Sequence, residues 1–250
     1  MHFHLPKPLH GWREFAGEVG IIVLGVLIAL GAEQVAERIH QRQELREAED
    51  GMIAELRDDD LPQAFARIAV HNCNVDQLDA IEAAVEANSD RARVIALARA
   101  YHPVYRSWDD QAWKAAVNSQ AMVSAGANRM TKWATPYVIM PVLDQMAVSE
   151  QNEVAQLSAN ISGTGPLTAA QQDRLFQLIA SLRRYNRSMS GGSLVFMKEA
   201  GDAGVTLPSA TARQILLESK RKYGACVRKP TTSGVDLTSQ VATGAAILRY

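Results

Sequence analysis

The chain has 250 residues, of which 47% are apolar, and its formal net charge is −1. This length supplies enough apolar material for one sizeable core or two small ones. The charge balance excludes a nucleic-acid-binding protein that works by neutralising phosphates, since such a protein needs a clear basic excess. Strand-forming runs are scarce beside Ala, Leu, Gln, Glu and Arg, so the composition predicts an all-α fold.

The most informative segment is Phe15–Ala32 (FAGEVGIIVLGVLIALGA), which carries a single charge, at Glu18. At 1.5 Å per residue this helix spans about 27 Å, slightly short of a hydrocarbon core of about 30 Å. Trp12 and Phe15 are placed to lie in the interfacial aromatic belt at one end. We therefore predict an N-terminal tail over residues 1–14 and one transmembrane helix over residues 15–32, with the lipid bilayer as its first partner.

One face of this helix carries mostly small residues, which let the backbones of membrane helices approach closely. At 100° per residue, five candidate interface residues fall within about 40° of a common line: Glu18, Ile22, Gly25, Ala29 and Ala32. The opposite side carries Val23, Leu24, Leu27 and Leu30. This face predicts packing against other transmembrane helices, either of a second copy or of a larger complex. The alternative is that small residues are merely common in membrane helices and that Glu18 reaches the lipid surface.

A cleaved signal peptide is the main competing interpretation of the segment. Lys7 and Arg13 would form its basic region, residues 19–30 its apolar region, and Ala29-Leu30-Gly31 its cleavage site. Glu18 at the head of the apolar region argues against this interpretation. The helical pattern also continues from Ala32 into the following residues without a break.

The orientation in a membrane is poorly determined by charge. Lys7 and Arg13 precede the segment, while Arg38, Arg42 and Arg46 follow it. The two cysteines, Cys73 and Cys226, fit either a disulfide outside the cytoplasm or two free thiols inside it. We favour an N-terminal tail inside and a periplasmic body.

The block GWREFAGEVGIIVLGVLIALGAEQ, residues 11–34, resembles the opening of a group of uncharacterised bacterial membrane proteins. These proteins begin with a short polar tail and a Gly-Glu-rich apolar anchor, followed by a helical body. The stretch from Ser107-Trp108 to Gly126 is similar to their middle region. The resemblance implies a single-pass protein of a bacterial inner membrane, and it offers no catalytic residues.

Beyond the membrane segment we predict a helical stalk over residues 33–51, a bundle of about five to seven helices over residues 52–225, and a tail of uncertain structure over residues 226–250. The stalk helix is expected to continue to Asp60, where Asp58-Asp59-Asp60 before Leu61-Pro62 predicts a helix end and a restart. Arg38, Arg42 and Arg46 form a column of like charge, typical of a solvated face.

Helical periodicity and capping signals place the helices of the body. Two capping-box patterns occur, Ser107-x-x-Asp110 and Thr168-x-x-Gln171, and Thr135-Pro136 predicts a helix start. Gly191-Gly192 predicts a kink or an end. The expected helices are 63–87, 91–101, 107–124, 135–160, one from Thr168 to about residue 190, and 208–223. The apolar core is expected to include Leu78, Ile81, Leu143, Leu178, Ile179 and Leu182.

The sequence contains no catalytic, cofactor-binding or metal-binding signature. Its six histidines lack the spacing of metal sites, and no nucleophile elbow, Walker loop or dinucleotide fingerprint occurs. Because His71 and Cys73 are near neighbours on a helix, they point in different directions, and Cys73 is expected to be a small buried residue. We therefore expect no enzyme and no cofactor.

Two functional classes remain. The first is a membrane-anchored helical interaction or accessory protein, a scaffold whose transmembrane helix pairs with others. The second is a membrane-tethered ligand-binding or sensing domain with a pocket between helices. A single membrane helix followed by a polar stalk favours the first.

Overall fold

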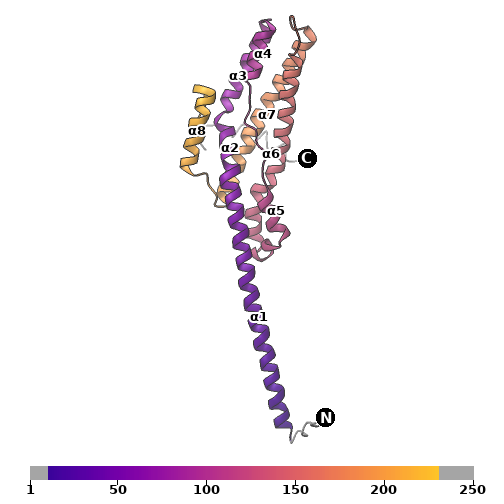
Figure 1. Cartoon of the computed structure of the whole chain (residues 1–250), viewed down its shortest axis with the longest axis vertical. Helices are drawn as coiled ribbons and strands as arrows, with labels where there is room; N and C mark the ends of the chain where they lie inside the picture. Colours follow the sequence, from indigo (N-terminus) through magenta and orange to yellow (C-terminus); the bar gives the residue numbers. More distant parts are fainter. Residues whose placement is uncertain (1–10, 231–250) are drawn as a thin grey trace, which may run out of the picture. The chain divides into compact units, whose positions relative to one another are not determined.

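The computed structural model describes residues 11–230, and within that range the protein is all-α, with no strand. The first helix, α1 (Trp12–Glu55), contains the apolar segment and the beginning of the body. Contacts divide the chain into two compact units, with the boundary between Glu47 and Ala48. The fold class predicted from the sequence is confirmed (Figure 1).

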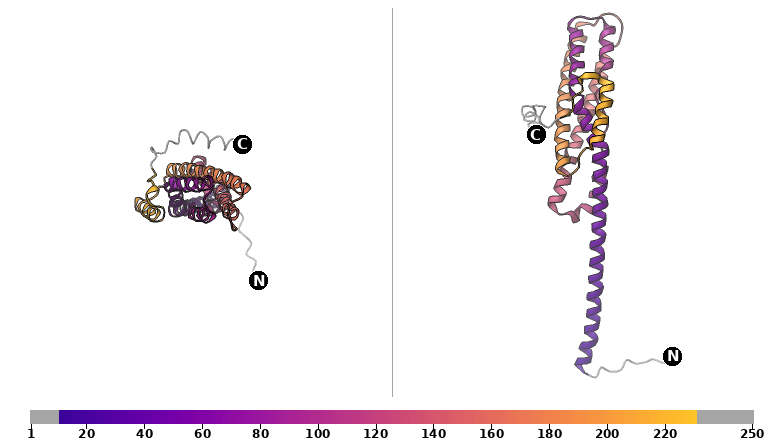
Figure 2. Two further views of the ribbon diagram at one scale, coloured as in Figure 1. Left: turned by 90° about the horizontal axis from the view of Figure 1, so that it is seen from above. Right: turned by 90° about the vertical axis from the view of Figure 1, so that its left-hand side faces the viewer.

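The second unit is a helical bundle organised around α7 (Ala169–Asp202). α6 (Ala127–Asn160) and α7 form a long antiparallel hairpin, and α7 also packs against α2 (Leu61–Ala69) and α3 (His71–Glu86). α4 (Arg91–Ala100) lies against α3 and α6, and α5 (Gln111–Asn118) follows a ten-residue connection. α8 (Ser209–Tyr223) lies alongside α2, at the outside of the bundle (Figure 2).

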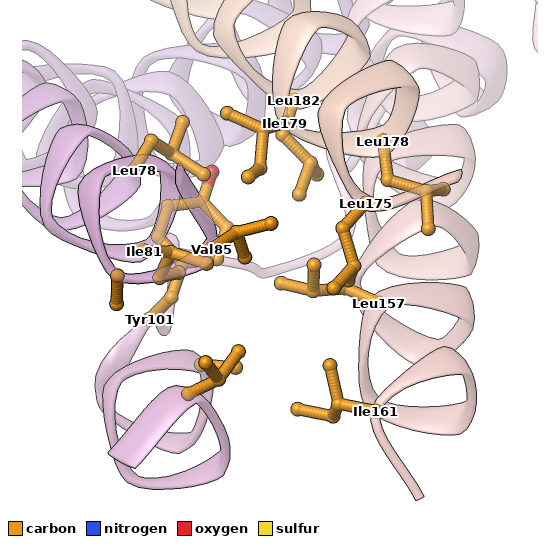
Figure 3. Close-up of a cluster of buried hydrophobic side chains, with 13 residues drawn as sticks. Leu78, Ile81, Val85, Tyr101, Leu157, Ile161, Leu175, Leu178, Ile179 and Leu182 are labelled. Carbon is orange, nitrogen blue, oxygen red and sulfur yellow. The ribbon is translucent and has the colours of Figure 1, made fainter. Parts of the chain in front are cut away.

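A hydrophobic core fills the end of the bundle where α3, α4, α6 and α7 meet (Figure 3). Its members are fully or almost fully buried, and they include Leu78, Ile81, Leu157, Leu178, Ile179 and Leu182. Leu143 is buried farther along α6. The core residues predicted from helical periodicity are therefore confirmed. Burying a Leu or Ile side chain stabilises the fold by about 1.5–3 kcal/mol, so this cluster is a main source of stability.

Several helix boundaries agree with the sequence signals. Thr168 and Gln171 form the predicted capping box at the start of α7, and Asp90 caps α4 by accepting a hydrogen bond from the Arg93 backbone N–H at 2.6 Å. The loop over residues 162–166 connects α6 to α7, in the gap between the expected helix 135–160 and the expected helix that starts at Thr168. Arg91 fixes this loop, since its guanidinium donates to the carbonyls of Gly165 and Pro166 at 2.8 and 2.9 Å.

The predicted helix end at Asp58–Asp60 is wrong. The chain remains helical from Phe15 to Ala69, passing through a π-helical turn, η1 (Leu56–Asp60). A π turn inserts an extra residue without breaking the helix, and Pro62 falls in the first turn of α2, where a missing N–H is tolerated. The break occurs instead at Val70, where the Ala69 carbonyl accepts a hydrogen bond from the Arg228 backbone N–H at 3.0 Å.

The predicted start of α6 at Thr135-Pro136 is also wrong, because α6 begins eight residues earlier, at Ala127. Pro136 lies inside the helix and cannot bond the preceding turn. The hydroxyl of Thr135 donates to the Thr131 carbonyl at 2.8 Å, so this part of the helix keeps a local hydrogen bond. Trp133, Pro136 and Tyr137 are buried, so tertiary packing holds this segment helical.

Two further expectations are corrected. The helix expected over residues 107–124 is shorter in the structure and consists only of α5. It ends because Gln120 adopts a left-handed conformation (φ +62°), and a short 3-10 turn follows, η2 (Ala121–Ala125). The predicted capping box is also absent, because Ser107 does not cap α5. Gly191-Gly192 does not end α7, which continues to Asp202. A Cβ on Gly192 would lie only 2.6 Å from Leu143 Cδ2, so this glycine allows a close approach of α6 and α7.

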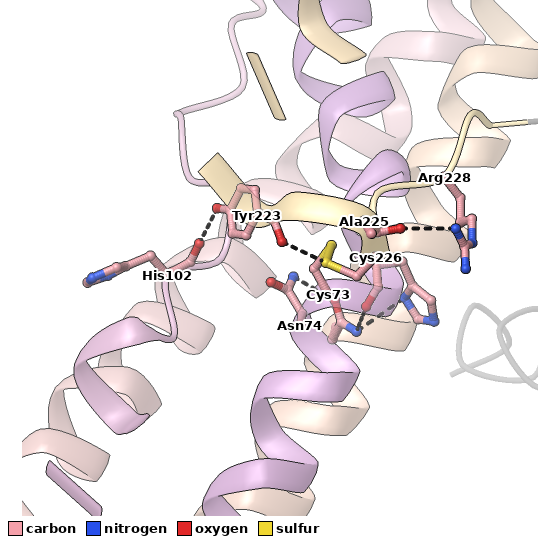
Figure 4. The surroundings of a disulfide bond; sticks show 9 residues. Cys73, Asn74, His102, Tyr223, Ala225, Cys226 and Arg228 are labelled. Carbon is pink, nitrogen blue, oxygen red and sulfur yellow. Dashed lines mark hydrogen bonds between the residues drawn. A yellow bond between two sulfur atoms is a disulfide. The ribbon is translucent and has the colours of Figure 1, made fainter. Parts of the chain in front are cut away.

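Cys73 and Cys226 form a disulfide that joins the start of α3 to the 3-10 turn after α8, η3 (Gly224–Cys226) (Figure 4). Ala69, Val70 and Val227 are buried around it. Cys73 and Cys226 are therefore paired with each other in the structure rather than present as free thiols. Of the C-terminal tail predicted over residues 226–250, the structure describes residues 226–230, and residues 231–250 lie outside the described range, as do residues 1–10.

Candidate membrane-helix interface and buried polar sites

The five predicted interface residues all lie on α1 and are all exposed. Their spacing of 4, 3, 4 and 3 residues keeps Glu18, Ile22, Gly25, Ala29 and Ala32 within about 40° of one line along the helix. A Cβ on Gly25 would meet no atom within 4 Å. The face is therefore open, with no side chain of the described chain covering Gly25.

The rest of this segment is apolar and exposed as well. Ile21, Leu24, Leu27 and Ile28 are each more than half exposed, and so are Val35 and Ile39 beyond the predicted end of the membrane segment. No residue of the most apolar window of this helix is buried inside the protein. Within residues 11–230 the structure has one helix long and apolar enough to cross a membrane, a property shared by signal sequences and by core helices of soluble proteins.

A buried ion pair lies inside the second unit, between Arg67 of α2 and Glu150 of α6. The two guanidinium–carboxylate contacts measure 2.7 and 2.5 Å, and each side chain is 1% exposed. Arg67 also donates to the Val104 carbonyl at 3.2 Å. A bidentate pair of this kind fixes the relative position of two helices, because breaking it leaves a buried charge without a partner.

A second polar network lies between α3 and α7. Ser190 Oγ lies 3.0 Å from His71 Nδ1, and Asn186 donates to the His71 carbonyl at 3.1 Å. Asn74 donates to the Asn186 side-chain oxygen at 3.0 Å. Burial lowers the pKa of His71, which favours a neutral ring.

The His71–Ser190 contact has the distance expected of a base and a nucleophile, but its surroundings differ from those of a catalytic site. Ser190 is 6% exposed and neither residue lines the cleft described below. The other polar side chains of this network are the amides of Asn186 and Asn74. A catalytic histidine instead contacts a carboxylate, which orients the ring and stabilises its protonated form. The arrangement is that of a buried polar network that fixes α3 against α7.

Two carboxylates lie at the ends of the π-helical turn: Glu55, which is half-buried just before it, and Asp60, which is buried as its last residue. Glu55 accepts a hydrogen bond from the Ala112 backbone N–H at 2.8 Å, and Asp60 accepts one from the Asp109 N–H at 3.3 Å. The second oxygen of each carboxylate is buried, with no hydrogen-bond partner among the described residues. Burial raises the pKa of Glu55, and it raises the pKa of Asp60 to about 8. Asp60 is therefore largely protonated at neutral pH.

No group of three or more His, Cys, Asp or Glu side chains in the described range is arranged to hold a metal ion. One open cleft, of about 360 Å³, lies between the connection after α4 and the helices α6 and α8. Its lining combines basic, amide and apolar side chains and contains no carboxylate.

The buried polar residues were not predicted from the sequence, although a signal for them exists. The inward positions of α6 follow a spacing of 4 and 3 residues, and Glu150 occupies one of them between Leu143 and Leu157. Asn186 similarly interrupts the apolar row of α7. A polar residue at an inward position indicates a partner on a facing helix, but it does not identify that partner. No family model, curated protein or solved structure was found to match this chain.

Proposed function

We propose that this chain is a single-pass membrane protein that acts as an accessory or scaffold subunit, without catalysis of its own. In this proposal residues 15–32 cross a bacterial inner membrane, and the face of Glu18, Ile22, Gly25, Ala29 and Ala32 packs against other transmembrane helices. The observation that carries the proposal is the exposed apolar surface all round this part of α1. Exposing such an apolar surface to water is unfavourable in free energy, whereas contact with lipid or with a facing helix removes that cost.

The disulfide supports a periplasmic position for the body. Cys73 is 1% exposed and joined to Cys226, and structural disulfides of this kind persist in oxidising compartments. The buried ion pair and polar network support a structural role for the body, because their members bond to one another rather than into a cleft.

The first test is whether the helix is retained in the membrane and on which side the body lies. Alkaline carbonate extraction should leave the full-length protein in the membrane pellet. Maleimide labelling in intact cells should find Cys73 and Cys226 blocked by their disulfide until a reductant is added. Release of a soluble form beginning near Ala32 would identify a signal peptide, and two freely reactive thiols would place the body in the cytoplasm.

The second test is whether the small-residue face mediates association. Gly25→Leu and Ala29→Leu should reduce crosslinking to neighbouring helices in native membranes, because a large side chain blocks close approach. Val23→Ala and Leu27→Ala, on the opposite face, are matched controls that should change little. Glu18→Leu should be more damaging than Glu18→Gln, which keeps hydrogen-bonding capacity. Equal association of all these variants would mean that the segment only anchors the protein and does not mediate association.

The membrane-tethered ligand-binding domain is the second candidate, and the open cleft of the body favours it. Purification from native membranes separates the two. Co-purifying membrane subunits support the scaffold, whereas a stable single species with a bound small molecule supports the ligand-binding domain.

A further inference from the structure

The open cleft of the second unit has three walls that come from distant parts of the chain. One wall is the connection over residues 102–106, the second consists of Gln151 and Val154 of α6, and the third is Lys222 of α8. Its volume of about 360 Å³ lies at the small end of the range for ligand pockets, about 300–1,000 Å³. A small molecule would fit this volume.

The charge of the lining is of one sign. Arg106 and Lys222 line the cleft, and no aspartate or glutamate does. The nearest acidic neighbour of Arg106 is Asp59, at 4.0 Å, and both side chains are more than half exposed, so their attraction is weak. Lys222 makes no ion pair with the described residues, and its ammonium lies 4.8 Å from the centre of the Tyr223 ring. Both cations are thus available to an anion.

The walls are fixed before any ligand arrives. Three alternate carbonyls of the connection are bonded by side chains of the body: His102 by the Tyr223 hydroxyl at 2.6 Å, Val104 by Arg67 at 3.2 Å, and Arg106 by Gln63 at 3.1 Å. The disulfide holds the end of α8, four residues beyond Lys222 (Figure 4). A preformed site loses little entropy on binding.

Apolar side chains complete the lining. Val104 and Val154 are partly buried, and Tyr105 is 47% exposed beside the cations. Gln151 adds an amide that can donate to or accept from a ligand oxygen. We propose that this cleft binds a small organic carboxylate, with its anionic oxygens between Arg106 and Lys222 and its short apolar group against Val104, Tyr105 and Val154. This inference does not depend on the membrane association proposed above.

The test uses the full-length protein in lipid nanodiscs and titration calorimetry with 3-phenylpropionate. We expect saturable binding, and no saturable binding of 3-phenylpropylamine, which has the same apolar group with the opposite charge. Arg106→Gln and Lys222→Gln should each weaken binding by up to about fivefold, the effect of losing one exposed charge pair of about 1 kcal/mol. Arg221→Gln is the matched control, since Arg221 is an exposed cation of the same helix turn that does not line the cleft.

Thermal unfolding of the three variants should resemble that of the wild type, so that a change in binding reflects the site rather than the fold. Several outcomes would overturn the proposal. They are the absence of saturable binding of 3-phenylpropionate, equal binding of the amine, and an affinity loss in Arg221→Gln as large as in Lys222→Gln.

Discussion

Gly191 and Gly192 offer a matched pair of substitutions in the middle of α7. Replacing a glycine inside a helix with alanine stabilises the helix by about 1 kcal/mol, and this gain applies to both positions. A Cβ at position 191 meets no atom within 4 Å, whereas a Cβ at position 192 lies 2.6 Å from Leu143 Cδ2. Carbon atoms prefer a separation of about 3.5–4.0 Å, so Leu143, which is fully buried, must move by about 1 Å.

Forcing an extra carbon into a packed core typically costs about 1–3 kcal/mol. We therefore expect Gly191→Ala to raise the free energy of unfolding by up to about 1 kcal/mol, and Gly192→Ala to lower it by up to about 2 kcal/mol. For a protein of this size, 1 kcal/mol shifts Tm by about 2–4 °C. Thermal unfolding of the detergent-solubilised chain, followed by circular dichroism at 222 nm, measures both values.

A third variant isolates the contact. Leu143→Ala removes the clashing methyl groups, so it should cost less stability in the Gly192→Ala background than in the wild type. Equal stabilisation by Gly191→Ala and Gly192→Ala would refute the inference that Gly192 is required for the close approach of α6 and α7.

Three further predictions concern the buried groups. The folded pKa of Asp60 is about 8 against 3.8 for the unfolded chain, so the proton stabilises the fold at low pH and this contribution is lost as the pH rises through 8. The free energy of unfolding should therefore fall by up to about 4 kcal/mol between pH 5 and pH 9, and Asp60→Asn should flatten this part of the pH profile measured by denaturant titration. Arg67→Met should destabilise the protein by about 3–5 kcal/mol in the same titration, whereas Arg67→Met with Glu150→Leu should recover most of that loss; a double variant as unstable as the single one would contradict the buried-charge argument. Leu178→Ala, at a site 1% exposed, should cost about 2–5 kcal/mol in thermal unfolding, and a cost below about 1 kcal/mol would contradict its place in the core.

The helix starts that depend on local chemistry could be predicted from the sequence. Thr168 with Gln171 is a self-contained signal, because both hydrogen bonds of a capping box form within one turn. Helical periodicity likewise identified Leu178 and Ile179, since one apolar face implies one buried face.

The features that depend on distant partners could not be predicted in this way. In the sequence, Pro136 is typical of a helix start. Only the burial of its neighbours explains why α6 continues through this proline. Gly192 reads as a helix breaker, although its role depends on Leu143 of another helix. The cleft joins Arg106 to Lys222, which are separated by more than a hundred residues and share no motif.

The predicted membrane face is a different case. Its five residues follow from helix geometry alone, so the structure reproduces their alignment on α1 and adds that they are exposed. A partner helix is a property of another chain, and periodicity within one sequence carries no information about its identity.

The link between Cys73 and Cys226 closes a loop of 153 residues in sequence separation. The exposed connection over residues 162–166 and the partly exposed connection over residues 203–208 lie inside this loop. A protease that cuts either connection therefore produces two fragments that remain covalently joined, and the nick becomes visible on a gel only after reduction. The apolar segment of α1 lies on the same side of any such cut as Cys73. Both fragments of a nicked body would thus remain attached to this apolar segment for as long as the disulfide stays oxidised.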